Sequence, residues 1–369
     1  MSNLIKKKNN QDAFLALVRA GLWEKDVWLS QFGQIDFNEV YRLAEEQSVV
    51  GLVAAGIEHV KDVKVPQQIA LTFVGGTLQI EQRNLSMNEF AIWLINRLND
   101  NSIKSLIVKG QGVAQCYERP HWRSSGDIDL LLDADNYEKA KIALFPLADS
   151  VDKEEKEAKH QALNIKGFEI ELHGRMPFFL SRRVDSVIDS VLNDSLNGGH
   201  RIWRTNNTEI YLPKPDNDVI IIFTHFLFHF FIEGVGLRQI CDWCRLLWLY
   251  RNEVNQELLE KRLQEMGLVS EWKTFAALAV KILGMPGERM PLYDNNPRYI
   301  KKAYKALNHI LKCGNMGHNN DLSYRMKYKG LGYKLVTFWR RLCDFVGFNF
   351  IFPIDAPKFF FSYVFDKVR

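Results

Sequence analysis

Two hydrophobic periodicities divide the chain. Through residues 11–100 apolar positions recur every three or four residues, as in "DAFLALVRAGLW" and "FNEVYRLAEEQSVVGLVAAGIEHV", which is the spacing of one buried helix face. Asp36 precedes "FNEV" in the position of an N-cap, and Pro66 lies near the start of a later helix. The pattern therefore predicts an N-terminal helical region over residues 1–100.

The pattern shortens after residue 100. "SLIVKG" is an apolar run ended by glycine, which predicts a buried strand leading into a turn. "GVAQCYE" predicts a short helix, "DIDLLLD" a strand and "ADNYEKAKIALFPLAD" an amphipathic helix. "HQALNIKGFEIELHG" contains two strand-like runs around Lys166-Gly167, the pattern of a hairpin. This alternation predicts a small α/β core over residues 101–215.

Helical spacing returns over residues 216–322. The most apolar stretch, "VIIIFTHFLFHFF", is too short to span a bilayer and contains two histidines, so a buried helix is expected. The last segment, residues 323–369, interleaves aromatic with basic residues. Binding of RNA, of an acidic polymer or of a membrane surface stays open for this segment. Packing of its aromatic rings onto the protein, with the lysines solvated, is favoured.

Composition limits the class of protein. Hydrophobic residues make up 47% of the 369 positions and charged residues 25%, which is typical of a folded chain of two or three domains. The net charge of +4 neither demands nor excludes nucleic acid as a partner. Five cysteines, an odd number, indicate reduced thiols. No signal-peptide core follows the basic N-terminus, and a cytoplasmic protein is expected.

Two strands carry acidic residues. Alternation places Asp127 and Asp129 on one face of "GDIDLLL", and Glu169, Glu171 and His173 on one face of "GFEIELHG". If the strands are neighbours, their apolar faces set a common register, and the acids converge. Carboxylates this close need a cation among them, and Mg²⁺ suits such oxygen ligands, with Mn²⁺ as the alternative ion. The other interpretation is a row of solvent-facing acids on a half-exposed strand.

The motifs carry a resemblance. "SLIVKGQGVAQCYERPHWRSSGDIDLLLD", followed about forty residues later by "HQALNIKGFEIELHGR", resembles the DNA polymerase β-type nucleotidyltransferase superfamily. Within it the chain is similar to a bacterial family of uncharacterised nucleotidyltransferases. The close match covers residues 103–176, and a weaker one continues through "HFLFHFFIEGVGLRQICDW". The resemblance implies an α+β fold, in which a small mixed-sheet core is flanked by N-terminal and C-terminal helical regions, with residues 216–322 covering the site.

The resemblance assigns roles to the acids. Asp127 and Asp129 match the metal-binding pair of the superfamily. Glu171 matches its third acid, because that acid stands immediately before a Leu-His pair, here residues 172–173. Glu171 is thereby implied as a metal ligand and as a candidate base. Glu169 shares the face but not the motif position.

The phosphate-binding turn departs from the superfamily pattern. The usual turn is Gly-Gly or Gly-Ser, whereas this chain has Lys109-Gly110. Gly110 permits close backbone approach to a phosphate, and Lys109 supplies a positive charge. Arg123 and Ser125 are implied on the phosphate side, and Gly126 lets the chain approach the substrate. The departure leaves nucleotide preference and catalytic competence open.

Further polar residues are candidates for orienting the acids or contacting substrate. His160 and His173 stand at the two ends of the predicted hairpin, so they are expected to be near neighbours. Arg238 and Asp242 lie four residues apart, and a helix ion pair is the simplest interpretation. A substrate-facing role for Arg238 or Asp242 is the alternative.

A zinc site is a further alternative. Cys241 and Cys244 form a C-x-x-C pair, with His225 and His229 one helical turn apart upstream. The sequence has no second pair at zinc-like spacing. Buried helix faces are therefore the favoured explanation.

These observations predict a Mg²⁺-dependent nucleotidyltransferase. It would move a nucleoside monophosphate from an NTP to a hydroxyl group, releasing pyrophosphate. A small molecule, a sugar, an RNA end and a protein side chain all remain open as the acceptor, as do the base preference and the oligomeric state. The alternatives are a non-catalytic relative that senses nucleotide and a nuclease that uses the same metals.

Overall fold

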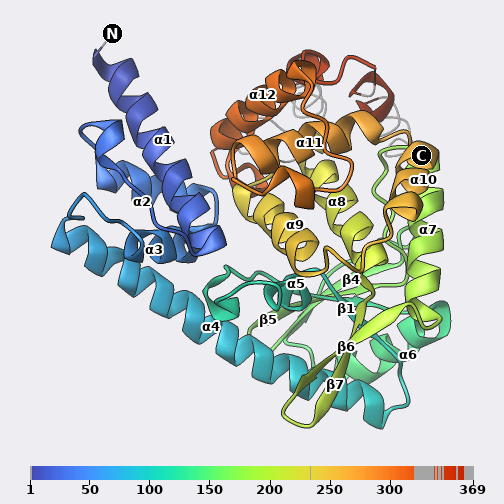
Figure 1. Ribbon diagram of the computed structural model, residues 1–369. Coiled ribbons are helices and arrows are strands. Elements are labelled where there is room, and N and C mark those ends of the chain that lie inside the picture. Colours follow the sequence, from blue (N-terminus) through green and yellow to red (C-terminus); the bar gives the residue numbers. More distant parts are fainter. Residues whose placement is uncertain are drawn as a thin grey trace.

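A computed structural model describes most of the chain. Its described residues are 2–232 and 234–319, together with 336, 339, 342, 345–354 and 356–360. Four N-terminal helices, a central sheet and a C-terminal group of helices follow one another (Figure 1). The long helix α4 (Gln67–Asp100) runs from beneath the first three helices to the far end of the sheet, and the C-terminal helices stand over the opposite side of the sheet. The predicted α+β class is confirmed.

The N-terminal helices form where the sequence predicts them. They are α1 (Ser2–Trp23), α2 (Phe37–Glu46), α3 (Val50–Glu58) and α4. The Asp36 side chain accepts hydrogen bonds from two backbone amides in the first turn of α2, as expected of an N-cap. Pro66 immediately precedes α4.

Glycine allows α1 and α3 to cross in close contact. A Cβ atom added to Gly21 would lie 1.9 Å from the Leu52 carbonyl oxygen, and one added to Gly56 would lie 2.1 Å from the Leu17 carbonyl oxygen. Real atoms never approach this closely, so the two backbones touch only because neither residue has a side chain.

A seven-stranded mixed sheet forms the centre, with strand order β3-β4-β5-β2-β1-β7-β6. The strands β1 and β2 are antiparallel, whereas β2 pairs with β5 in parallel. The strand bounds are β1 Leu106–Val108, β2 Ile128–Leu131, β3 Ser150–Val151, β4 His160–Ile165, β5 Phe168–His173, β6 His200–Thr205 and β7 Thr208–Pro213. The predicted hairpin is β4–β5, and its turn at Lys166-Gly167 has positive φ at both residues.

Three strands and one helix were not predicted. The edge strand β3 is only two residues long, and α7 (Arg182–Leu196) with the β6–β7 hairpin fills residues that the sequence patterns left unassigned. The hairpin turn at Asn206-Asn207 has positive φ at both positions. Asparagine tolerates this conformation, so the turn carried a usable signal.

The two faces of the sheet have different coverings. Ile128 and Leu130 of β2 pack against the C-terminal half of α4 and against α6 (Ala134–Leu144) in one apolar cluster. Because side chains alternate along a strand, the residues between them point to the other face. That face lies under α8 (Pro215–Ile232) and α9 (Leu237–Leu249), with the short helix α5 (Gly110–Ala114) between β1 and α9.

The C-terminal helices share an aromatic core. They include α10 (Gln256–Met266), α11 (Val269–Lys281) and α12 (Pro297–Cys313), and residues 219–231 lie within the buried helix α8 as predicted. Phe223 of α8 contacts Trp243 and Trp272, both fully buried. None of the helices in the described part of the chain has the length and apolar composition of a membrane span.

Part of the aromatic C-terminal segment packs as expected. The rings of Phe348 and Phe359 are buried and contact Phe231 of α8, whereas Trp339 is 65% exposed. Phe338, Phe361 and most basic residues of this segment lie outside the described residues.

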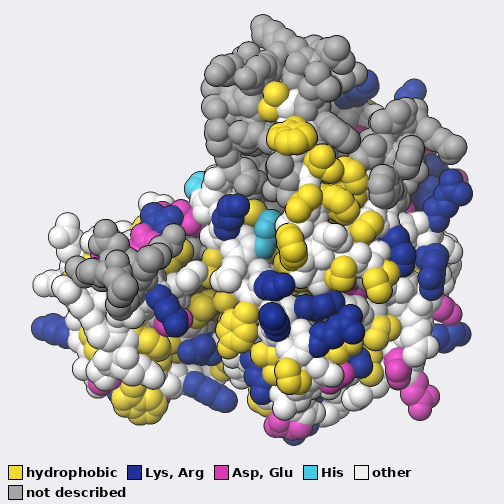
Figure 2. Space-filling model, turned by 90° about the horizontal axis from the view of Figure 1, so that it is seen from above, with side chains coloured by type: hydrophobic (Ala, Val, Ile, Leu, Met, Phe, Trp, Pro, Cys, Tyr) yellow, Lys and Arg dark blue, Asp and Glu magenta, His cyan; other side chains and the backbone are white. Residues whose placement is uncertain are grey.

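On the surface seen from above, Lys and Arg side chains gather over the middle of the face, with apolar ones among them (Figure 2).

The N-terminal and C-terminal helices belong to one core. A single apolar cluster continues from α1 to α12. The buried Gln47, just after α2, accepts a hydrogen bond from the Leu237 amide at the start of α9 and donates one to the Ile310 carbonyl of α12. One amide side chain thus joins three segments that are far apart in the sequence.

The crossing of α1 and α3 yields a stability prediction. Gly56→Ala forces these backbones apart and should lower the free energy of unfolding by about 1–3 kcal/mol. Gly75→Ala is the matched control, because an added Cβ there meets no atom within 4 Å on the exposed side of α4. It should raise stability by about 0.5–1 kcal/mol through helix propensity. Chemical denaturation measures both, and equal effects would contradict the close crossing.

Candidate functional site

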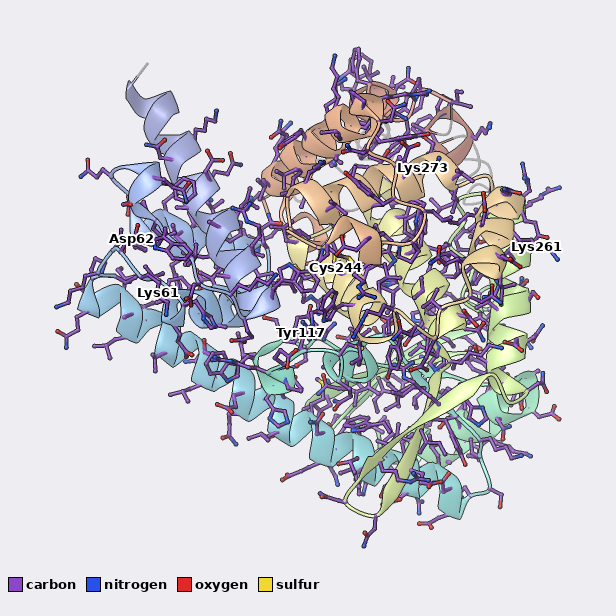
Figure 3. The ribbon with its side chains drawn as sticks, viewed as in Figure 1. Lys61, Asp62, Tyr117, Cys244, Lys261 and Lys273 are labelled. Atoms are coloured by element: carbon purple, nitrogen blue, oxygen red, sulfur yellow. The ribbon has the colours of Figure 1, made fainter. Side chains whose placement is uncertain are left out.

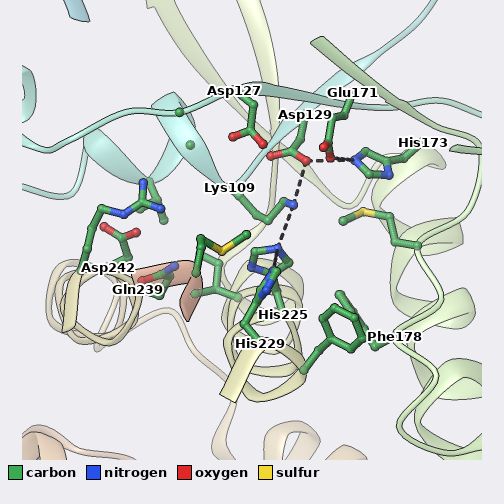
Figure 4. Close-up of a pocket in the computed structure, with 18 of the residues that line it drawn as sticks. Lys109, Asp127, Asp129, Glu171, His173, Phe178, His225, His229, Gln239 and Asp242 are labelled. Carbon is green, nitrogen blue, oxygen red and sulfur yellow. Dashed lines mark hydrogen bonds and ion pairs between the residues drawn. The ribbon is translucent and has the colours of Figure 1, made fainter. Parts of the chain in front are cut away.

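A pocket of about 560 Å³ opens on the polar face of the sheet (Figure 4). Its floor is formed by the ends of β1, β2 and β5, and its opposite wall by α8 and α9. The loop over residues 175–179, which follows β5, forms one side. The residues predicted to bind metal or phosphate line this pocket, namely Lys109, Gly110, Arg123, Ser125, Gly126, Asp127, Asp129 and Glu171.

The parallel pairing of β2 with β5 brings the acids together. Asp129 stands directly opposite Glu171 in the register, so both point into the pocket. Oxygen atoms of Asp127, Asp129 and Glu171 lie within 4.8 Å of one another. The predicted convergence is confirmed. Glu169 is exposed and does not line the pocket, as its place outside the motif suggested.

The carboxylates differ in their electrostatics. The negative charge of Asp129, together with burial, raises the pKa of Asp127 to about 6. Burial alone would also raise the pKa of Glu171, but the close contacts of its carboxylate with the His160 and His173 rings outweigh burial and hold that pKa well below its usual range. At pH 7 Glu171 is therefore ionised, and Asp127 is mostly ionised but becomes protonated as the pH falls through about 6.

Two histidines flank Glu171, as expected from the hairpin. His160 and His173 are cross-strand partners whose rings stack with centroids 4.9 Å apart. The His173 Nε2 atom lies 2.9 Å from Asp129 Oδ1 and 3.2 Å from Glu171 Oε2. These contacts outweigh burial and raise the pKa of His173. His173 therefore orients two of the three acids.

Lys109 extends from the end of β1 into the acidic cluster. Its Nζ atom is 2.7 Å from Asp129 Oδ1 and 3.2 Å from His225 Nε2 (Figure 4). Burial lowers the pKa of Lys109, but the charges of Asp129, Asp127 and Glu171 outweigh it, and the pKa is raised overall. The Lys109 backbone has φ 57° and ψ −143°. A side chain in this glycine-like region costs about 1–3 kcal/mol.

Arg123 is held by a buried ion pair. Its Nε and Nη2 atoms each donate to one oxygen of Asp242 at 2.8 Å, and the Tyr117 hydroxyl donates to Asp242 as well. The predicted pair between Arg238 and Asp242 does not form, because Asp242 faces Arg123. Arg238 instead donates to the Ser124 carbonyl oxygen.

Of the residues that the sequence predicts to bind phosphate, only some have donors available to a ligand. Arg123 is 6% exposed and committed to Asp242. In contrast, the Nε atom of Arg238 and the Oγ atom of Ser125 are buried without a hydrogen-bond partner. Gly110 has φ 37°, and a Cβ on Gly126 would meet no atom within 4 Å. Arg238 and Ser125 are thus the donors that a ligand would satisfy.

His225 and His229 were not predicted as site residues. Both line the pocket, and their Nε2 atoms lie 3.1 Å apart. Burial, reinforced by the nearby Lys109, lowers the pKa of His225 well below its usual value, so the imidazole is neutral and accepts from Lys109. Their spacing in the sequence placed them on one helix face but gave no sign of Lys109 opposite them.

The zinc alternative finds no support. Among the described residues, the groups of three that could hold a metal ion are Asp127–Asp129–Glu171 and His160–Glu171–His173. Cys244 lies among the C-terminal helices (Figure 3), and Cys241 and Cys244 are fully buried. Burial raises the pKa of both thiols, which disfavours the thiolate form that zinc needs.

A family profile described as uncharacterised nucleotidyltransferase matches residues 33–284, which is more than half of the chain. The chain belongs to this family. The match extends beyond the motif region into α2–α4 and α8–α11, so it includes all the walls of the pocket named above. Comparison with curated proteins and with solved structures gave no match.

The Arg123–Asp242 pair of this nucleotidyltransferase family member yields a second prediction. Arg123→Met leaves a buried carboxylate without its cation, so the free energy of unfolding should fall by about 3–5 kcal/mol. The double variant Arg123→Met/Asp242→Leu removes both charges and should recover most of the loss. Denaturant titration of the two variants measures this. An unchanged stability in Arg123→Met would mean that the pair is not structural.

Proposed function

We propose that the protein is a Mg²⁺-dependent nucleotidyltransferase. It transfers a nucleoside monophosphate from an NTP to a hydroxyl group of an acceptor and releases pyrophosphate. The observation that carries this proposal is the convergence of Asp127, Asp129 and Glu171 on a pocket that is also lined by two residues with an unsatisfied donor, Arg238 on α9 and Ser125 in the loop before β2. Membership of a nucleotidyltransferase family supports the same reaction class.

The three acids fit a hard divalent cation. Mg²⁺ binds carboxylate oxygens at about 2.0–2.1 Å in an octahedron, so its ligand atoms lie roughly 3–4 Å apart. The oxygens of Asp127, Asp129 and Glu171 lie within 4.8 Å of one another, which is near such spacing. Mn²⁺ fits the same donors. The bound ion would neutralise charge on the transferred phosphoryl group.

The remaining steps rest on residues of the chain. The triphosphate is bound by the backbone at Gly110 and by the free donors of Arg238 and Ser125. Arg123 acts indirectly, by fixing Asp242 on α9 beside Arg238. The depressed pKa of Glu171 favours its role as a ligand over that of a proton acceptor. The covering helices α8 and α9 exclude water from the phosphates.

The size of the pocket supports a small acceptor. A volume of about 560 Å³ lies within the range of roughly 300–1,000 Å³ that is typical of small-molecule sites. It accommodates a nucleotide together with one hydroxyl-bearing group, whereas a duplex nucleic acid would need an open groove. A small molecule or a single sugar is therefore favoured over the other acceptors.

Calorimetry of NTP binding tests the proposal. Asp127→Asn/Asp129→Asn should abolish Mg²⁺-dependent NTP binding, and chelation of Mg²⁺ should do the same in the unaltered protein. Glu169→Gln removes an exposed acid on the same strand as Glu171 and should leave binding unchanged. Equal binding by the double variant and the unaltered protein would contradict the metal site. Binding without any labelled product from NTP and cell extract would favour the sensor alternative.

The raised pKa of Asp127 predicts a pH dependence. Binding of Mg²⁺ requires the ionised carboxylate, and the pKa of Asp127 is about 6 before the ion binds. The affinity for Mg²⁺ should therefore be constant well above pH 6. It should fall by up to about tenfold per unit as the pH drops below 6. Titrations at several pH values measure it, and a flat profile down to pH 5 would contradict the electrostatics.

A further inference from the structure

Lys109 places a positive charge inside the cluster of acids that the proposed function assigns to the metal. Its ammonium is 2.7 Å from Asp129 Oδ1, and the side chain is 12% exposed. Asp127 and Glu171 also act on it electrostatically. Without a metal, this ammonium offsets part of the repulsion among three carboxylates that lie within 4.8 Å of one another.

The backbone conformation of Lys109 is unfavourable for any residue with a side chain, which indicates a role for the lysine. Lys109 adopts φ 57° and ψ −143°, a conformation that glycine takes without strain and lysine does not. A glycine would therefore fit the local turn better. The cost of this strain is offset by the attraction between the Lys109 ammonium and the surrounding carboxylates.

The ammonium and a divalent ion compete for the same carboxylates. Lys109 Nζ lies 2.7 Å from Asp129 Oδ1, and His173 donates to the same oxygen. A divalent ion held by Asp127, Asp129 and Glu171 would place a second positive charge beside this ammonium and draw on the same negative charge, so it would weaken the contact between Lys109 and Asp129.

The pocket offers Lys109 only a weak alternative anchor among the described residues. The neutral His225 accepts from Lys109 at 3.2 Å, but its Nε2 atom is also approached by His229 Nε2 at 3.1 Å. One imidazole nitrogen has one lone pair, so the two contacts compete. An ammonium displaced from Asp129 is therefore free to meet an anion in the pocket.

We propose that Lys109 is a resident cation of the metal site, which holds the acids in the metal-free protein and moves to the nucleotide phosphates when a divalent ion enters. The inference rests on the proposed function. It makes the binding of metal and nucleotide mutually dependent. A metal releases Lys109 for the phosphates, and phosphates draw Lys109 away from the acids, so each ligand raises the affinity for the other.

Metal binding without nucleotide is the direct test. In calorimetry on the full chain, Lys109→Met should bind Mg²⁺ at least about tenfold more tightly than the unaltered protein, because no internal cation has to leave. The factor by which an NTP increases Mg²⁺ affinity should shrink in the same variant. Lys104→Met is the matched control: it removes the same charge from an exposed residue before the other end of β1, and should change neither quantity.

A second variant separates charge from backbone strain. Lys109→Gly also removes the ammonium, so its Mg²⁺ affinity should rise as in Lys109→Met. It also relieves the positive φ, so without metal its melting temperature should exceed that of Lys109→Met. Should the methionine variant fail to fold, the glycine variant still supplies the metal titration.

The outcomes are distinguishable. Equal Mg²⁺ affinity in the unaltered protein and in both Lys109 variants would overturn the resident-cation proposal and leave the proposed function standing. Absence of Mg²⁺ binding in all of them would overturn both. Binding that is measurable only after Lys109 is replaced would support the proposal in its strongest form.

Discussion

The parallel pairing of β2 with β5 is the constraint on which the site depends. It places Asp129 beside Glu171 and turns Ile128, Leu130, Ile170 and Leu172 into the apolar cluster below. A shift of one residue would bury the acids against α4 and expose the aliphatic side chains, so the hydrophobic effect fixes the register. The acids are thus brought together against their mutual repulsion by the burial of residues that have no part in the chemistry.

Much of this arrangement was predictable, and for a physical reason. Alternation along "GDIDLLL" and "GFEIELHG" reports the buried face of each strand, and a shared buried face implies a shared polar one. The helices of the N-terminal region and α8 followed from their spacing in the same way. The helical regions, the hairpin and the convergence of the acids therefore rest on local patterns that the fold preserves, whereas the α+β class was implied by the family resemblance.

The sequence patterns left β3, α7 and the β6–β7 hairpin unassigned, and the predictions that proved wrong concern the partners of side chains. Arg238 and Asp242 have the spacing of a helix ion pair, but spacing on one helix does not show what approaches from outside it. Arg123, more than a hundred residues earlier, pairs with Asp242, so its guanidinium is committed to that carboxylate although it lines the pocket. The contact of Lys109 with His225 is equally long-range. Local patterns place a side chain on a face, whereas tertiary packing chooses its partner.

Gln47 connects segments from the two ends of the chain beside the pocket. Its amide links the end of α2 to the start of α9 and to α12, and the neighbouring Ser48 lies on the pocket rim with Asn315, which donates to it. This amide therefore ties the N-terminal helices to α9 and α12 at the edge of the pocket. Moving Ser48 away from Asn315 would break the hydrogen bond between them, so the pocket cannot widen there without loss of contacts between segments from the two ends of the chain.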